Sequence, residues 1–366
     1  MSERNPDETP ESGAEASSVT RAADSEAETG STDSDQQDHI EYFLEDITYQ
    51  GKSPRTREAY GRVLREFRAY LTSRGLDLES ANHRDCMAYI HQLRGEVGES
   101  TVASYASYLH RFYEYMTRVD AFSENPMAVV LEELDEEITT DPARRDITVA
   151  EMRSFVASVA HPLDCAIVLV LLKTGIRAGE LCNLDTRDLF LSDTALDTAH
   201  RPRLDGRPDS LYVDSVPAVS KGYNGERRTA SNKRKRATTI PVDDELAAVL
   251  ERWLAVRPDP VSPADPLFVS TGKRWGQRLT PDVVHHIVTG HTREAGWYRE
   301  GAGPEENVTP HYFRHFFTTH LRDRTGDRGV VKYLRGDVAQ DIIDTYTHDW
   351  GDRVRNVYDQ YIYAVL

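Results

Sequence analysis

An acidic break in the helical pattern is the feature that most constrains the fold, because it divides the chain into two parts. This break, residues 132–147, contains Pro142, which cannot continue a helix. Its carboxylates repel one another: Glu132, Glu133, Asp135, Glu136 and Glu137. A chain of 366 residues is long enough for two domains of ordinary size, ~100 to 200 residues each. We therefore predict a domain at 39–131, a linker at 132–147 and a second domain at 148–366.

The first of these domains has a helical pattern of apolar residues. Ser53 and Pro54 form an N-cap and first-turn pair ahead of one amphipathic run, and a second run, Val102 to Met116, follows Ser100. Apolar residues of the first run recur at helical spacing: Tyr60, Val63, Leu64, Phe67, Tyr70 and Leu71. We expect their aromatic rings to pack in the core, and the domain to be helical.

The second domain mixes helices with short strands. Thr148 and Glu151 have capping-box spacing, and a fully buried helix is expected at 163–172. Leu211–Val219 and Thr238–Val242 are β-branched segments that flank a basic stretch, so they predict a hairpin or small antiparallel sheet. Helical spacing returns at 246–254, and Thr-Pro pairs at 280 and 309 predict two further helix starts.

The N-terminal 38 residues differ from both domains. They contain eleven carboxylates and two arginines, with almost no large apolar side chain, so we predict a disordered acidic tail at 1–38. This tail accounts for −9 of the net charge of −17, and it leaves room for a local basic site elsewhere.

The sequence argues against a membrane-spanning protein and against a fold held by disulfides. The longest apolar run, Cys165–Leu172, is far shorter than the ~18 residues that a membrane helix requires, and no apolar leader follows the first residue. The three cysteines are odd in number and lack metal-ligand spacing. We expect a cytoplasmic protein with no membrane contact and no structural metal.

Three islands of polar residues could carry chemistry. The first is Thr174-Gly175-Ile176-Arg177-Ala178-Gly179-Glu180-Leu181, which alone could be a helix C-cap followed by a surface ion pair. In the second, residues 309–315, His311 and Arg314 share one face near a helix N-terminus, which favours an anion but also fits a solvated edge. The third, residues 333–337 with 344–348, is uninformative by itself.

Taken in order, the islands resemble the tyrosine recombinase family (phage integrase and Xer-type), over about residues 39–366. Thr-Gly-x-Arg-x-x-Glu-Leu is similar to that family's first arginine box, and His-x-x-Arg-His is similar to its second. Ser-Pro-x-Thr-x-x-x-Tyr at 53–60 and the segment 101–126 are similar to its core-binding domain. The resemblance implies a mainly α fold: an N-terminal helical (SAM-like) core-binding domain and an α+β catalytic domain of the DNA breaking-rejoining type, with a small antiparallel sheet.

The resemblance also implies a nucleophile and its helpers. Counting nine residues from Asp337, at the end of the third box, leads to Tyr346 as the nucleophile. Arg177 and Arg314 would clamp the phosphate, and His311 would assist deprotonation of the tyrosine. Asp337 is a further catalytic candidate at the third box, where it departs from the family, which usually has His or Trp there. Tyr358, Tyr361 and Tyr363 are rival tyrosines whose ordinary role would be packing.

A catalytic lysine is implied by its distance from a proline. Counting back eight residues from Pro241 leads to Lys233, on a mobile hairpin, as the general acid; Lys235 and Lys221 are alternatives. The basic stretch also predicts DNA-backbone contacts, or a solvated loop, and the remaining candidates are supporting residues. The DNA-binding candidates are Lys221, Arg234, Lys235 and Arg236, and the supporting ones are Glu180 and His315.

These expectations describe a site-specific DNA recombinase that forms a 3′-phosphotyrosine intermediate and requires no metal or cofactor. Its partners would be a double-stranded recombination site and further protomers, in a tetrameric synapse. The alternatives are a DNA-binding accessory protein that has lost cleavage and a type IB topoisomerase-like enzyme. High acidity, with only seven lysines among 44 basic residues, is typical of proteins from salt-accumulating haloarchaea.

Overall fold

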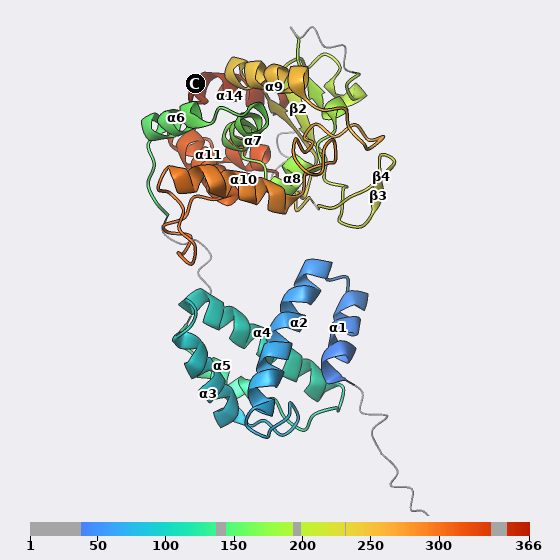
Figure 1. The fold of residues 1–366 in the computed structure, drawn as a ribbon, viewed down its shortest axis with the longest axis vertical. Helices are drawn as coiled ribbons and strands as arrows, with labels where there is room; N and C mark the ends of the chain where they lie inside the picture. The colour runs from blue at the N-terminus through green and yellow to red at the C-terminus, as the bar shows by residue number, and fades with distance from the viewer. Residues whose placement is uncertain (1–37, 137–143, 193–198, 231, 338–349) are drawn as a thin grey trace, which may run out of the picture. The chain divides into compact units, whose positions relative to one another are not determined.

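The chain divides into two compact units in the computed structural model, Met1–Ile138 and Thr139–Leu366 (Figure 1). The structure describes residues 38–136, 144–192, 199–230, 232–337 and 350–366. Within these ranges no helix combines the length and apolar character needed to cross a membrane. The predicted tail, residues 1–37 of it, lies outside the described residues.

The N-terminal unit is built from helices. The Ser53 hydroxyl accepts a hydrogen bond from the Thr56 N–H, so the predicted cap is confirmed. The second predicted run begins slightly earlier than expected, at Glu99, because Gly98 is its N-cap. The helices are α1 (His39–Tyr49), α2 (Pro54–Thr72), α3 (His83–Arg94), α4 (Glu99–Arg118) and α5 (Met127–Glu132).

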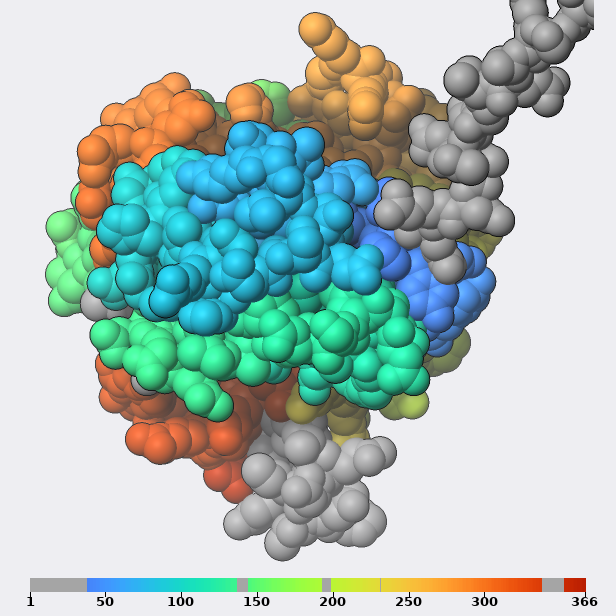
Figure 2. Space-filling view, turned by 90° about the horizontal axis from the view of Figure 1, so that it is seen from below, coloured from blue at the N-terminus to red at the C-terminus, as the bar shows by residue number. Residues whose placement is uncertain are grey.

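Aromatic side chains fill the core of this unit, as predicted. Phe43 and Phe112 are fully buried and meet edge to face, with ring centroids 5.5 Å apart. Tyr113 is 1% exposed, and its hydroxyl donates a hydrogen bond to the Leu78 carbonyl. Side chains of successive helices, coloured blue to green, form a continuous surface over this core (Figure 2).

The C-terminal unit is mainly helical with short strands. Thr148 and Glu151 form the predicted capping box. Thr280 caps the helix that begins at Pro281, whereas Thr309 precedes Pro310 without a side-chain capping bond. The helices are α6 (Val149–Ser158), α7 (Pro162–Thr174), α8 (Ala178–Cys182), α9 (Asp244–Val256), α10 (Pro281–Glu294), α11 (Pro310–Thr325), α12 (Arg328–Arg335) and α14 (Trp350–Tyr361).

Helix α7 is the centre of this unit. It is apolar on all sides, as a helix buried in a core must be, and it packs against α6, α8, α9, α10 and α11 (Figure 1). The ends of α7 and α11 are thereby held together, and these are the elements that carry the two arginine boxes.

A small antiparallel sheet lies in the same unit. Its strand order is β1 (Leu189–Phe190), β2 (Ser210–Val213) and β5 (Thr238–Pro241), with Leu211 opposite both Leu189 and Ile240. The predicted segment at 211–219 is strand only up to Val213, and Val216 beyond it is 68% exposed. Between β2 and β5 the chain forms a separate hairpin, β3 (Gly222–Tyr223) with β4 (Glu226–Arg227).

The C-terminal segment packs on the rest of the C-terminal unit. Helix α14 contacts α11 and β5, and the Tyr358 and Tyr363 hydroxyls donate to the Lys173 and Leu172 carbonyls of α7. Both tyrosines are at most 1% exposed, and burial raises their pKa well above the usual value. A packing role for these two tyrosines was predicted, and the structure confirms it.

Candidate active site

The first arginine box begins at a glycine that no other residue could replace easily. Gly175 ends α7 with φ +63°, and a Cβ atom there would lie 2.3 Å from Cδ1 of Phe317. The turn leads to Arg177, the N-cap of α8, whose backbone N–H donates to Oε2 of Glu180 at 3.0 Å. The Arg177 guanidinium donates to Oε1 at 3.1 Å. Glu180, which is fully buried, thus holds both the backbone and the side chain of Arg177.

The second arginine box is carried by the first turns of α11. Arg314 is 2% exposed, and its Nη1 donates to the Gly175 carbonyl at 2.6 Å and to the Arg335 carbonyl at 3.1 Å. Burial, followed by the charge of Arg177, lowers the pKa of Arg314 to about 10. The side chain therefore remains a cation at neutral pH and is held from two sides by backbone.

Asp337 lies where these arginines meet. Its Oδ1 accepts from Nη2 of Arg177 at 3.0 Å and from Nη2 of Arg314 at 2.8 Å, and its Oδ2 also accepts from Arg314 at 2.8 Å. Oδ2 is also 2.8 Å from Nε of Arg335. Partial burial opposes ionisation, but the charges of Arg314 and Arg335 and the bond from Arg177 lower the pKa of Asp337. Three guanidinium groups therefore surround one carboxylate.

We call Arg177, Arg314, Arg335 and Asp337 the arginine pocket. Three cations and one anion leave an excess positive charge, and planar guanidinium forks match the paired oxygens of a carboxylate or a phosphate. Both oxygens of Asp337 accept hydrogen bonds from Arg314, as the oxygens of other oxyanions do from guanidinium groups. The pocket is therefore suited to bind an oxyanion.

His311 stands beside this pocket at the start of α11. Its side chain is exposed, yet its pKa is lowered to about 4, first by desolvation on the side that faces the protein and then by the charges of Arg144, Arg314 and Arg177. At neutral pH the imidazole is therefore uncharged and able to accept a proton. His315, the predicted supporting residue, is partly buried, and its ring centroid lies 5.9 Å from that of Tyr312.

The predicted lysine segment lies between β4 and β5. Lys233, Lys235 and Arg236 are exposed there, and Lys221 is exposed just before β3. Within the described part of the chain, the Nζ atoms of Lys233 and Lys235 have no hydrogen-bond or ion-pair partner. Both ammonium groups of this segment are therefore exposed and unpaired among the described residues.

Arg234 corrects the prediction of a DNA contact. Its side chain is fully buried, and it donates to the Leu334 carbonyl at 3.1 Å from Nη1 and to Glu180 at 3.3 Å from Nη2. A guanidinium committed to the protein interior cannot bind DNA backbone in this conformation. The prediction was wrong because basic runs are usually solvated, whereas here one member has buried acceptors.

The predicted nucleophile, Tyr346, and its neighbour His348 lie outside the described residues. The structure describes the three other tyrosines that could be the nucleophile. Tyr358 and Tyr363 are buried, as shown above, whereas Tyr361 is partly exposed on α14. The assignment of Tyr346 as nucleophile remains a prediction, which rests on its separation of nine residues from Asp337 in the sequence.

Sequence reasoning missed two arginines. Arg335, in the pocket, lies within the third island but carries no family signal. Arg144 belongs to the predicted linker, yet its charge helps to lower the pKa of His311, and its Nε is buried without a hydrogen-bond partner among the described residues. Only three-dimensional proximity distinguishes either one from ordinary surface arginines.

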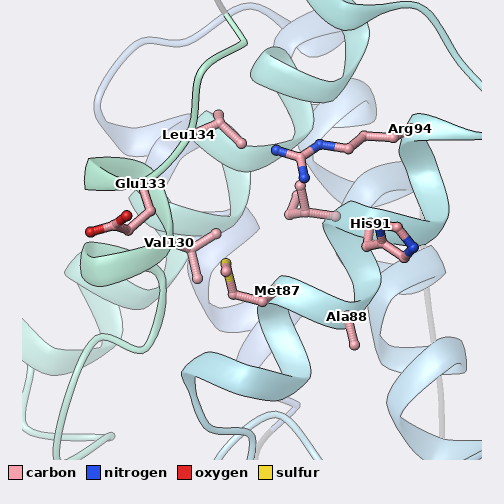
Figure 3. A pocket seen from close by; sticks show the side chains of 8 residues that line it. Met87, Ala88, His91, Arg94, Val130, Glu133 and Leu134 are labelled. Carbon is pink, nitrogen blue, oxygen red and sulfur yellow. The ribbon is translucent and has the colours of Figure 1, made fainter.

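The N-terminal unit has a hollow of about 360 Å³ between α3 and α5 (Figure 3). Its walls are mostly apolar, with Met87 and Val130 facing each other across it, while Glu133 turns its carboxylate away. At its rim Arg94 pairs with Glu136. The hollow has no convergence of arginines like that of the arginine pocket, and we assign no chemistry to it.

Comparisons with known proteins agree on one family. Residues 146–350 match the model of the phage integrase family, and residues 40–119 match that of the phage integrase N-terminal SAM-like domain. Tyrosine recombinase XerD of Shewanella oneidensis is 26% identical over 331 residues, which cover 88% of this chain and 95% of XerD. Tyrosine recombinase XerC of Pelobacter propionicus is 24% identical over 317 residues, covering 86% and 91% of the two chains.

Solved structures show the same fold. The Tn1549 transposon integrase in complex with a circular intermediate DNA gives a TM-score of 0.60 at 18% identity, covering 88% of this chain and 99% of that one. A lambda integrase dimer bound to a COC′ core site gives a TM-score of 0.56 at 15% identity, covering 81% and 93%. The predicted fold class, a helical SAM-like domain followed by a mainly helical catalytic domain with a small sheet, is confirmed.

Proposed function

This chain belongs to the phage integrase family of tyrosine recombinases, and on that premise we propose that it is a site-specific DNA recombinase. It cuts and rejoins DNA through a 3′-phosphotyrosine intermediate. The arginine pocket carries this proposal: Arg177 and Arg314, from different elements, each direct their Nη2 at the same oxygen of Asp337. The meeting of these two side chains at one oxygen supports the roles that the resemblance implies for them.

The first chemical step is a transfer of the phosphoryl group to tyrosine. The Tyr346 oxygen attacks phosphorus, the bond from phosphorus to the 5′ oxygen breaks, and the 3′ phosphate remains on the enzyme. The phenol, with a usual pKa of ~10, gives its proton to a base as it attacks, and we assign that task to His311, which is uncharged at neutral pH. The departing 5′ oxygen takes a proton from Lys233 or Lys235.

The two arginines stabilise the charge that develops on the phosphate. Arg314 is held by the Gly175 and Arg335 carbonyls and Arg177 by Glu180, so both forks are oriented before DNA arrives. Groups that are already oriented need little reorganisation in the transition state, which makes such stabilisation effective.

Asp337 is a placeholder for the phosphate. An ionised carboxylate and a phosphodiester cannot share the same forks, because like charges at such distances repel strongly. The DNA phosphate therefore displaces Asp337 from Arg177 and Arg314, and the pair with Arg335 retains the carboxylate at the edge of the pocket. Arg335 then acts both as an anchor for Asp337 and as a further cation near the phosphate.

The partners and setting follow from the same premise. The DNA complexes of the structural neighbours support binding to a double-stranded recombination site. Exchange between two such sites uses several protomers, in a tetrameric synapse, in the cytoplasm. The acidic, lysine-poor composition supports a halophilic source.

Recovery of covalently bound DNA tests this function. The protein is incubated with a library of nicked duplexes, from which the cleaved 5′ fragment diffuses away and prevents rejoining. Adducts that survive denaturation are isolated, and their DNA is sequenced. The proposal predicts one recurrent sequence attached through its 3′ end. DNA binding without any adduct would contradict it and would indicate an accessory protein.

A further inference from the structure

Arg234 joins three parts of the site. Its Nη1 and Nη2 donate to the Leu334 carbonyl at 3.1 and 3.2 Å, just before the third box, and Nη2 donates to Glu180 of the first box at 3.3 Å. Nη1 also donates to the Thr238 hydroxyl, at the start of β5. The same Glu180 carboxylate holds Arg177. One buried fork therefore connects the first arginine box, the end of α12 and the strand that follows the lysines.

The backbone reinforces this connection. The Lys235 N–H donates to the Gly336 carbonyl at 3.3 Å. Gly336 has φ +67°, and a Cβ atom there would lie 2.5 Å from Cγ of Arg234 and 2.6 Å from its Nη1. Only glycine leaves room for the arginine at this point. The lysine segment is thus fixed next to the residue that precedes Asp337.

Burying Arg234 is costly, which calls for an explanation beyond stability. A buried ion pair generally stabilises a fold no better than well-packed apolar residues of similar volume. Desolvation lowers the pKa of Arg234, and its Nε has no hydrogen-bond partner among the described residues. A methionine would fill much of the same space without that cost. Methionine could not form the hydrogen bonds by which Arg234 links the first box, the end of α12 and the lysine segment.

We propose that Arg234 is a positioning residue, which holds Lys233 and Lys235 so that one of them protonates the departing 5′ oxygen. The two lysines flank Arg234 and are exposed while it is buried, so fixing Arg234 fixes the backbone from which both ammonium groups project. This inference rests on the proposed function, because it assigns a task within the same cleavage step.

A change of leaving group tests the proposal. In a 5′-bridging phosphorothiolate, sulfur replaces the leaving oxygen and departs as a thiolate, which requires no proton because a thiol has a pKa of only ~8.5. Nicked duplexes with the recovered site are made in both forms. Arg234→Met should slow adduct formation about 100-fold on the ordinary duplex but only about threefold on the sulfur duplex, as loss of a general acid does. DNA affinity, measured by fluorescence anisotropy, should not change, because the buried side chain does not reach DNA.

Arg228→Met is the matched control. Arg228 is another buried arginine, paired with Asp185 and remote from the arginine pocket in its contacts. Its loss also removes a buried guanidinium, and any slowing of adduct formation should be equal on the two duplexes. Lys233→Ala and Lys235→Ala identify the general acid. Only the variant that lacks it should be slow on the ordinary duplex and nearly as fast as the parent on the sulfur duplex.

The possible outcomes distinguish a failure of the positioning role from a failure of the proposed function. If the parent protein forms no adduct with either duplex, the proposed function fails. If the parent cleaves both and Arg234→Met is slowed equally on both, the positioning role is wrong and Arg234 is only structural. Should Arg234→Met fail to fold, Arg234→Lys is used in its place: it keeps the charge but cannot reach Leu334 and Glu180 together, and the same difference between duplexes is expected.

Discussion

Replacing Asp337 by asparagine should make the catalytic unit respond to free anions. Asn keeps the shape of the side chain but removes the charge that three arginines share, at 2.8 Å from Arg314, 2.8 Å from Arg335 and 3.0 Å from Arg177. Without that carboxylate the pocket holds three cations and no anion. The variant should therefore be less stable in chloride and should bind sulfate or phosphate in place of the missing group.

The size of the effect follows from the exposure of Asp337. Its side chain is 28% exposed, so solvent screens each contact to about 1 kcal/mol, and three contacts give about 3 kcal/mol. For a unit of ~150 to 250 residues this corresponds to a fall in melting temperature of about 6 to 12 °C. Sulfate at 100 times its Kd would restore about 2.7 kcal/mol, nearly the whole loss.

Thermal unfolding with increasing sulfate, against chloride at equal ionic strength, measures this response. Asp327→Asn is the control, because Asp327 pairs with Arg353 outside the pocket and is 22% exposed. Sulfate should raise the melting temperature of Asp337→Asn strongly, and that of the parent and the control weakly. Adduct formation by Asp337→Asn should not fall below that of the parent. If the parent and Asp337→Asn gained equally from sulfate, Asp337 would not occupy the anion position.

Three further outcomes are expected. Desolvation lowers the pKa of His311 to about 4, so protonation of His311 opposes folding as the pH falls below its usual pKa of ~6.5. The acid limb of the pH profile of kcat/KM for adduct formation should therefore lie below pH 6. An acid limb at the ordinary histidine pKa would contradict this. Arg177→Lys or Arg314→Lys should reduce the cleavage rate at least about 100-fold, since a single ammonium cannot form two parallel bonds; single-turnover kinetics at saturating DNA would reveal retained activity. Deleting residues 1–38 should leave the melting temperature and cleavage unchanged, because the segment lacks apolar groups to dock, and a large fall in melting temperature would oppose that view.

Local signals in the sequence predicted local structure well. Ser53 and the Thr148–Glu151 pair cap helices as expected, because a cap depends on residues within one turn. Burial of 163–172 followed from an apolar run without a polar face. The two arginine boxes could be identified because each combines several residue types at fixed spacing within eight positions.

Contacts between distant segments could not be predicted in the same way. Asp337 meets Arg177 across 160 positions, and Arg234 meets Leu334 across 100. Nothing in the spacing of a basic run says which member will turn inward, so Arg234 was placed on the surface with its neighbours. The aspartate at the third box departs from the family pattern, and its contacts with three guanidinium groups likewise could not be predicted from the sequence.

Identification of the tyrosine that carries DNA tests the central claim most directly. The covalent complex with the recovered site is digested with protease and nuclease, and the modified peptide is sequenced by mass spectrometry, in parallel with a Tyr346→Phe variant. The account predicts a 3′-phosphonucleotide on Tyr346, and a variant that binds the same DNA without forming an adduct, because only one oxygen has been removed. An adduct on Tyr361, or one that persists in Tyr346→Phe, would contradict it.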